Sequence, residues 1–105
     1  MTSVEIRRVE TNKKQYLALL LLADEQEDMI DRYLERGSMY VLEDDGVKAE
    51  CVVTDEGGGV LELKNIAVEP DFQGKGYGKA LVDFLIRTYA GQYMLLQVGT
   101  GDSPS

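Results

Sequence analysis

Histidine and tryptophan are absent from this sequence of 105 residues, and cysteine occurs once, at Cys51. Without histidine the chain lacks the commonest zinc ligand and the commonest general base. A single cysteine excludes an internal disulfide and any cysteine-rich metal cluster. Its apolar neighbours indicate that Cys51 is a small apolar residue that fills space in a strand. We therefore expect no metal site, and a reducing cytoplasm is the compartment that this cysteine usage indicates.

Basic residues are also few, and long apolar runs are absent. The chain has 11 lysine and arginine residues against 19 aspartate and glutamate residues, a net charge of −8. Such a charge repels the phosphate backbone of nucleic acids, whereas cationic amines suit it better. No apolar run approaches the roughly 18 residues that span a bilayer, and residues 1–10 do not resemble a signal peptide. We expect a cytoplasmic protein that binds neither nucleic acid nor membrane.

What is present indicates one folded domain over residues 1–105, because 44% of the residues are apolar and 29% are charged. Alternation of apolar and polar residues predicts strands. Apolar residues at helical spacing, together with capping residues, predict helices. An Asp-Gly turn at 45–46 and a turn of acidic and glycine residues over 55–59 indicate two hairpins. The predicted elements are a strand over 4–9, helices over 16–22 and 24–37, strands over 39–42, 49–53 and 60–68, a helix over 80–89 and a strand over 93–98.

The last predicted helix connects the strand over 60–68 to the strand over 93–98, and such a crossover requires these two strands to run parallel. The order is therefore β-α-α-β-β-β-α-β. The sequence predicts an α+β fold of three layers, in which helices cover both faces of a mixed, mostly antiparallel sheet.

A glycine-rich segment precedes the last predicted helix and reads Gln73-Gly74-Lys75-Gly76-Tyr77-Gly78-Lys79. Its glycines leave backbone N–H groups unshielded, and the helix that follows directs the positive end of its dipole toward them. The two lysines supply local positive charge in an acidic protein. This arrangement suits a pyrophosphate, although a flexible turn with solvated lysines is the plainer interpretation.

The spacing excludes two common phosphate-binding motifs. A P-loop requires serine or threonine after Gly78-Lys79, but Ala80 stands there. A dinucleotide fingerprint starting at Gly74 or Gly76 requires a small residue where Lys79 or Leu81 stands, and antiparallel hairpins do not belong to a doubly wound sheet.

The segment matches the pattern Gln-x-x-Gly-x-Gly through Gln73, Gly76 and Gly78, after the strand sequence LKNIAV and the link EPDF. On these motifs the chain resembles the GNAT family of acetyl-CoA-dependent N-acetyltransferases. The resemblance covers the whole chain in element order and is most specific over residues 61–85. It implies that acetyl-CoA is the cosubstrate, that residues 66–68 pair with the pantetheine arm as an added strand between the separating parallel strands, and that the glycine-rich segment binds the pyrophosphate. The implied cofactor-binding residues are Ile66, Ala67, Val68, Gln73, Gly74, Lys75, Gly76, Tyr77, Gly78 and Lys79.

The resemblance also implies direct attack of a small or peptidyl amine on the thioester, with the backbone amide of Val68 polarising its carbonyl. A general base must then take the amine proton. Glu62 matches the catalytic glutamate of the histone acetyltransferase branch, because it stands six residues before Val68. A strand glutamate that pairs with Lys64 is the alternative, and Asn65 is a second polar candidate. The acidic segment 24–31 either attracts the amine or forms a solvated helix face.

Full-length members of the family continue beyond the position of Ser105 with a helix, which bears a tyrosine general acid, and with two more strands. We therefore interpret the chain as the N-terminal part of the fold, incomplete after its fifth strand. Either it is a truncated product, or its strand over 93–98 pairs with a second copy to form a homodimer. The alternative function is a noncatalytic acyl-CoA binding or regulatory domain, and a nucleotide-binding module is a third hypothesis.

Overall fold

The computed structural model of the protein describes residues 4–98. Its elements are β1 (Glu5–Val9), η1 (Lys13–Tyr16), α1 (Leu17–Ala23), α2 (Glu27–Leu34), β2 (Ser38–Glu43), β3 (Val47–Gly57), β4 (Val60–Val68), η2 (Pro70–Phe72), α3 (Tyr77–Tyr89) and β5 (Leu95–Val98). None of the helices within this described part is long and apolar enough to cross a membrane.

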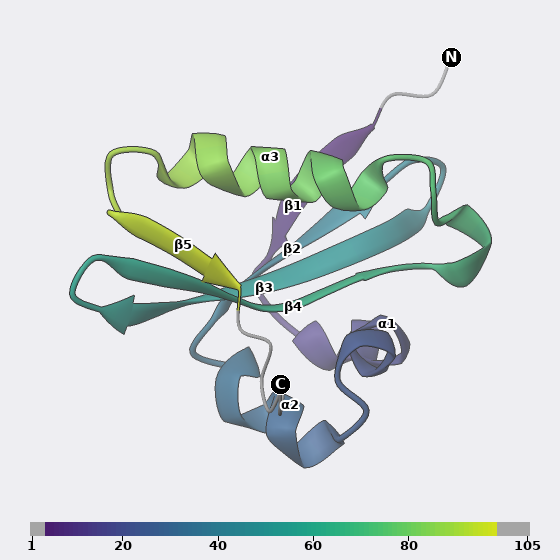
Figure 1. The fold of residues 1–105 in the computed structure, drawn as a ribbon. Coiled ribbons are helices and arrows are strands. Elements are labelled where there is room, and N and C mark those ends of the chain that lie inside the picture. The colour runs from purple at the N-terminus through teal and green to yellow at the C-terminus, as the bar shows by residue number, and fades with distance from the viewer. Residues whose placement is uncertain (1–3, 99–105) are drawn as a thin grey trace.

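The five strands form one sheet in the order β1-β2-β3-β4-β5. The first four strands pair antiparallel, and β5 pairs parallel to β4 after the crossover through α3. Helix α3 lies over one face of the sheet, and α1 and α2 lie on the opposite side (Figure 1). The mixed, mostly antiparallel sheet with helices on both faces is confirmed.

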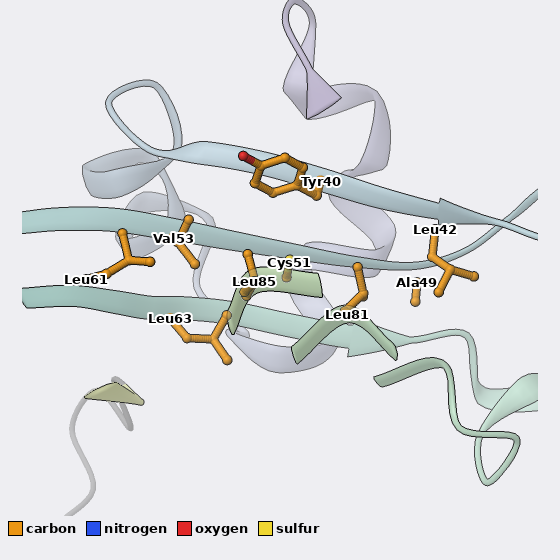
Figure 2. Packing of buried hydrophobic residues seen from close by; sticks show 9 residues of the cluster. All are labelled: Tyr40, Leu42, Ala49, Cys51, Val53, Leu61, Leu63, Leu81 and Leu85. Atoms are coloured by element: carbon orange, nitrogen blue, oxygen red, sulfur yellow. The ribbon is translucent and has the colours of Figure 1, made fainter. Parts of the chain in front are cut away.

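Each face of the sheet has its own buried apolar cluster. Helix α3 directs Leu81 and Leu85 toward the strands (Figure 2). The buried members of this α3-side cluster are Tyr40, Leu42, Ala49, Cys51, Val53, Leu61, Leu63, Leu81 and Leu85. The α1-side cluster consists of Val9, Leu20, Ile30, Tyr33, Leu34, Met39, Val41 and Val52. Residues of β3 alternate between the two clusters, as expected for a central strand.

Strand β4 contains a β-bulge at Lys64, the residue between Leu63 and Asn65 that takes no place in the described pairing with β3. An extra residue reverses the alternation of side chains along a strand. Leu63 therefore faces α3 before the bulge and Ile66 faces α3 after it. Asn65 turns to the other face, where its Nδ2 atom donates to the carbonyl oxygen of Leu20 at 3.1 Å.

Two predicted boundaries near the C-terminus are wrong. The last strand begins at Leu95 rather than at residue 93, because Tyr93 and Met94 belong to the connection, where Met94 N–H donates to the Gly59 carbonyl at 2.8 Å. Helix α3 begins at Tyr77 rather than at residue 80. The last three residues of the predicted glycine-rich loop therefore form the first turn of this helix.

The helix expected over 16–22 also differs at its start. A 3₁₀ turn, η1, precedes α1, and Asn12 before it has a left-handed backbone (φ 51°) with no capping hydrogen bond from its side chain. Strand β3 runs on to Gly57, so the turn predicted from the acidic and glycine residues over 55–59 is shorter than expected. Local composition indicated these features but did not fix their limits.

Lys13 is a buried charge that fixes η1 to the end of α2. Its Nζ atom donates to the carbonyl oxygens of Leu34 at 2.8 Å, Gly37 at 2.7 Å and Glu35 at 3.3 Å. The last carbonyl groups of a helix lack intrahelical donors and carry the negative end of its dipole. The ammonium group of Lys13 therefore satisfies the end of α2.

We expect Lys13→Met to lower the free energy of unfolding by about 3 kcal/mol, because it leaves buried carbonyl oxygens without a donor. Urea denaturation followed by circular dichroism measures this loss. The matched control is Lys14→Met, because Lys14 forms exposed ion pairs with Glu27 and Asp31 and such pairs contribute under about 1 kcal/mol. Equal losses in the two variants would contradict the assignment.

Candidate functional site

The glycine-rich turn between β4 and α3 has a backbone that favours glycine at two positions. Gly74 has φ 81° and Gly76, the N-cap of α3, has φ 90°. A Cβ atom at either position would meet no heavy atom within 4 Å, so the backbone conformation and not crowding calls for glycine there. The turn therefore exposes its backbone to solvent in front of the helix.

The N-terminus of α3 presents unpaired donors at this turn. Ala80 N–H donates to the Gly76 carbonyl at 2.9 Å. The N–H groups of Tyr77, Gly78 and Lys79 come before this first bonded donor and have no acceptor within the helix. Together with the positive end of the helix dipole they can bind an anion. Three amides of the helix thus lie beside the turn that the sequence analysis singled out, and the binding of a phosphate there stays a prediction.

The side chains around the turn contribute less than the backbone. Lys79 is 80% exposed and forms an ion pair with Asp83 at 2.9 Å, and Lys75 is exposed. The Tyr77 hydroxyl donates to Asp44 in the β2–β3 turn, a contact that raises the pKa of the tyrosine. Tyr77 can thus offer the anion only its backbone N–H.

The edge of β4 on the side of β5 is covered over only part of its length. β5 pairs with β4 from Val60 to Leu63. Ile66, Ala67 and Val68 lie beyond this pairing, and within residues 4–98 only β3 pairs with them. An edge of this kind can pair with an extended ligand.

A cavity of about 300 Å³ lies along this edge of β4. Its lining residues are Leu22, Ile66, Ala67, Val68, Gln73 and Gly78. Gln73 crosses from the turn to the strand, where its Nε2 atom donates to the Val68 carbonyl at 3.2 Å. The structure thus brings five of the ten predicted cofactor-binding residues together, and the other five continue the same turn.

Leu22 is the lining residue that the sequence analysis did not single out. It comes from the end of α1 and is 50% exposed, although its neighbour Leu20 is fully buried. A helix that is apolar on nearly all sides is usually packed on several of them. The signal in the sequence was the run of four leucines over 19–22, which is more than one buried helix face requires.

Glu62 does not line the cavity. The bulge at Lys64 places it on the opposite face of the sheet from Ile66 and Val68, although simple alternation predicts a shared face. Lys64 Nζ lies 2.8 Å from its carboxylate and Gln97 donates to it at 2.7 Å. The hydrogen bond from Lys64, more than any other contact, lowers the pKa of Glu62.

A buried polar group lies on the α1-side face of β3 and β4. Asn65 is 2% exposed, and its Nδ2 atom donates to the Tyr33 hydroxyl at 3.0 Å as well as to the α1 backbone. The Tyr33 hydroxyl in turn donates to Asp24 at 3.3 Å, and burial raises the pKa of Tyr33 to about 12. This chain of contacts joins the sheet to the start of the acidic segment 24–31.

Glu50 is the other member of this group, and the sequence analysis missed it. It is fully buried on β3, opposite Ala67 of β4. The signal in the sequence was a single charge within an otherwise apolar stretch of strand, Ala49-Glu50-Cys51-Val52-Val53. A strand that is apolar on both faces is buried on both faces, and so is any charge within it. No group of side chains in the described residues could hold a metal ion.

Comparison with known proteins agrees with this architecture. The family model described as "Acetyltransferase (GNAT) domain" matches residues 35–103. An uncharacterized N-acetyltransferase of Bacillus subtilis (strain 168), YvbK, is 38% identical over 96 residues, which make up 90% of this chain and 61% of that protein. The chain thus spans less than two thirds of the length of this relative.

Two solved structures are similar in both fold and sequence. A GNAT family acetyltransferase from Elizabethkingia anophelis with acetyl-CoA bound has a TM-score of 0.77 and 30% identity, over 82% of this chain and 57% of that one. A Bacillus subtilis acetyltransferase in complex with CoA has a TM-score of 0.75 and 36% identity, over the same 82% and 57%. With the family model matching more than half of its residues, the chain belongs to the GNAT family of acetyltransferases.

Proposed function

We propose that this chain binds acetyl-CoA between β4 and the start of α3 and transfers the acetyl group to a primary amine. The observation that supports this proposal most directly is the cavity at the free edge of β4, next to the N-terminus of α3. The two similar structures with acetyl-CoA or CoA bound supply the identity of the ligand.

The pyrophosphate lies at the start of α3 in this proposal. The amides of residues 74–79 bind its oxygens, because the glycines there carry no side chain that would prevent approach. Lys75 and Lys79 add positive charge, and Lys79 must leave Asp83 to do so. The exposure of both lysines makes their contribution smaller than that of the backbone.

The pantetheine arm lies along Ile66, Ala67 and Val68 as an added strand. The backbone amide of Val68 then polarises the thioester carbonyl, and the amine attacks the acetyl carbon directly. Glu62 is the proton acceptor that the family resemblance implies. Its ion pair with Lys64 keeps it ionised at neutral pH but also makes it a weak base. The proposed compartment is the cytoplasm, in which the free thiol of Cys51 stays reduced.

Calorimetric titration tests the proposal. We expect acetyl-CoA to bind this chain and ATP and NAD to bind at least about 100-fold more weakly, because only acetyl-CoA combines a pyrophosphate with an arm that can pair with β4. Thiol release in the presence of a primary amine then separates an active enzyme from a noncatalytic acyl-CoA binding domain. Equal affinities for the three ligands would contradict the assignment of the cavity.

A homodimer through β5 is the second part of the proposal. Met94, Leu95 and Val98 are 89%, 51% and 64% exposed, and β5 is the last strand of the described sheet. Exposed apolar edge strands pair readily with other chains. We expect sedimentation equilibrium to give twice the monomer mass for this chain and Leu95→Lys to shift it to the monomer. A cooperatively folded wild-type monomer would contradict the dimer.

A further inference from the structure

The carboxyl group of Glu50 lies in an apolar environment. It is fully buried, and its neighbours across the sheet are Val41 on β2 and Ala67 on β4. Neither of its two carboxyl oxygens has a hydrogen-bond partner among the described residues. Burying such a group without partners costs several kcal/mol, and native proteins rarely do so without a functional reason.

Within residues 4–98, the elements packed around Glu50 supply no positive charge to it. Helix α1 has no charged residue between Leu17 and Ala23, and α2 presents the hydroxyl of Tyr33, which is bonded to Asp24. The ammonium group of Lys13 on η1 is bonded to carbonyl oxygens. On the same face, Glu43 of β2 pairs with Arg7 of β1.

On the other face of β3, next to Glu50 in the chain, lies the buried thiol of Cys51. Burial and then the charge of Glu50 raise its pKa, so it is neutral at physiological pH. Burial alone raises the pKa of Glu50, to about 8.

A third buried acceptor lies beside Glu50 and also lacks a donor. Asn65 Oδ1 has no partner in the part of the chain that the structure describes, although its amide nitrogen is fully bonded. Val52 pairs with Asn65 and Glu50 pairs with Ala67. The two side chains are thus diagonal neighbours on one face, with Cα atoms roughly 7–8 Å apart. These three buried acceptor atoms require N–H or O–H donors. An amine, or a water that binds to the amine, can provide them.

This place adjoins the proposed cofactor cavity. Ala67, the partner of Glu50 on β4, lines that cavity together with Leu22 from the end of α1. Glu50 is therefore one cross-strand neighbour away from the cavity lining, and with Asn65 it begins a line of polar side chains. The contacts from Asn65 through Tyr33 to Asp24 continue the polar path toward the loop before α2.

We propose that Glu50 and Asn65 form the inner end of the acceptor subsite and that Glu50 takes the proton that the amine loses. This inference rests on the proposed acetyl transfer to an amine and assigns the role of proton acceptor to Glu50 in place of Glu62. The ammonium R–NH₃⁺ gives one proton to the Glu50 carboxylate through a bound water. The lone pair of the neutral amine forms the C–N bond to the acetyl carbon, the C–S bond breaks, and the CoA sulfur keeps its electron pair and takes the second N–H proton. Asn65 is a positioning residue that holds the water.

The first test needs no turnover. ¹³C NMR of the glutamate carboxyl carbons gives the pKa of Glu50 in the chain with CoA, alone and with butylamine or spermidine as the probe, and Glu50→Gln identifies its signal. We expect the amine to lower the pKa of Glu50 by at least about one pH unit, because a nearby cation favours the carboxylate. If the chain binds CoA but the pKa of Glu50 is unchanged with both amines, this inference is overturned and the proposed function is not. Failure to bind CoA would instead contradict the proposed function.

The second test is the pH profile of kcat/KM for the amine. We expect Glu50→Gln to lower kcat/KM at least about 100-fold, to remove the ionisation near the pKa of Glu50, and to leave the affinity for acetyl-CoA unchanged. The matched control is Thr54→Val, another buried polar residue on the same face of β3, which should retain both the rate and the profile. If Glu62→Gln removes that ionisation and Glu50→Gln keeps it, Glu50 is not the proton acceptor.

Discussion

Glu50→Gln is expected to raise the free energy of unfolding at pH 9 by several kcal/mol. It should also remove most of the fall in this free energy between pH 4.5 and 8. The unfolded chain binds a proton at Glu50 with a pKa near 4.5, whereas burial raises the pKa in the folded state to about 8. The stabilisation from the protonated carboxyl is therefore full below pH 4.5 and is lost as the pH rises to 8. At about 1.4 kcal/mol for each pH unit, the loss approaches about 5 kcal/mol.

Urea unfolding at pH 5, 7 and 9 measures this effect. The wild type and Glu50→Gln should have similar stabilities at the lowest pH, where the carboxyl is protonated and resembles an amide, and should diverge as the pH rises. Thr54→Val provides the matched control, because it alters a buried polar group on the same strand. The carboxyl that the Thr54 hydroxyl contacts, Glu56, has a lowered pKa and so titrates below the range in which Glu50 does. A Glu50→Gln variant that loses stability with pH as steeply as the wild type would show that this carboxyl is not the group responsible.

Gly78→Leu is expected to abolish acetyl-CoA binding, with affinity lowered more than about 100-fold, while the fold is retained. Gly78 lines the cavity, and a Cβ atom there would lie 3.7 Å from Val68 Cγ2 in ordinary contact. The remaining atoms of a leucine would occupy the space proposed for the pantetheine arm. Leucine also has a higher helix propensity than glycine, by roughly 1 kcal/mol, so the variant should be at least as stable as the wild type.

A graded series separates occlusion from unfolding. Gly78→Ala adds only the tolerated Cβ atom and should weaken binding far less than Gly78→Leu, as measured by calorimetry. Gly76→Val is a poorer test, because the left-handed backbone of Gly76 (φ 90°) would be strained by any branched residue. If Gly78→Leu binds acetyl-CoA as tightly as the wild type, the arm does not run through this cavity.

The element order could be predicted because each signal was local. Asp-Gly at residues 45–46 and the glycines over 57–59 predicted the hairpins. The helical spacing of apolar residues after Gly78 predicted the crossover that makes β4 and β5 parallel. The glycine-rich turn before α3 was likewise predictable from local signals, namely the spacing of its glycines and the helix start that follows them. These features depend on residues that are close together in the chain.

The interior of the candidate site was not predictable in this way. The bulge at Lys64 arises from the pairing of β3 with β4, and no residue type in the sequence LKNIAV marks it. By reversing the alternation it separates Glu62 from Val68 and turns Asn65 toward α1. The burial of Glu50 depends on α1 as well as on the strands beside it. Long-range packing decides these positions, and one sequence carries little information about it.

The strand order of the sheet also bears on how the chain acquires its structure. Because the strands lie side by side in the same order as along the chain, the meander over residues 38–68 can form as soon as it leaves the ribosome. Strand β5 must wait for α3 to cross the sheet, so its pairing closes the long connection over residues 69–94 rather than a hairpin turn. The turn at the start of α3 belongs to this late step, whereas the strand edge at residues 66–68 belongs to the early meander, so a ligand bound to both would join the early and late parts of the fold.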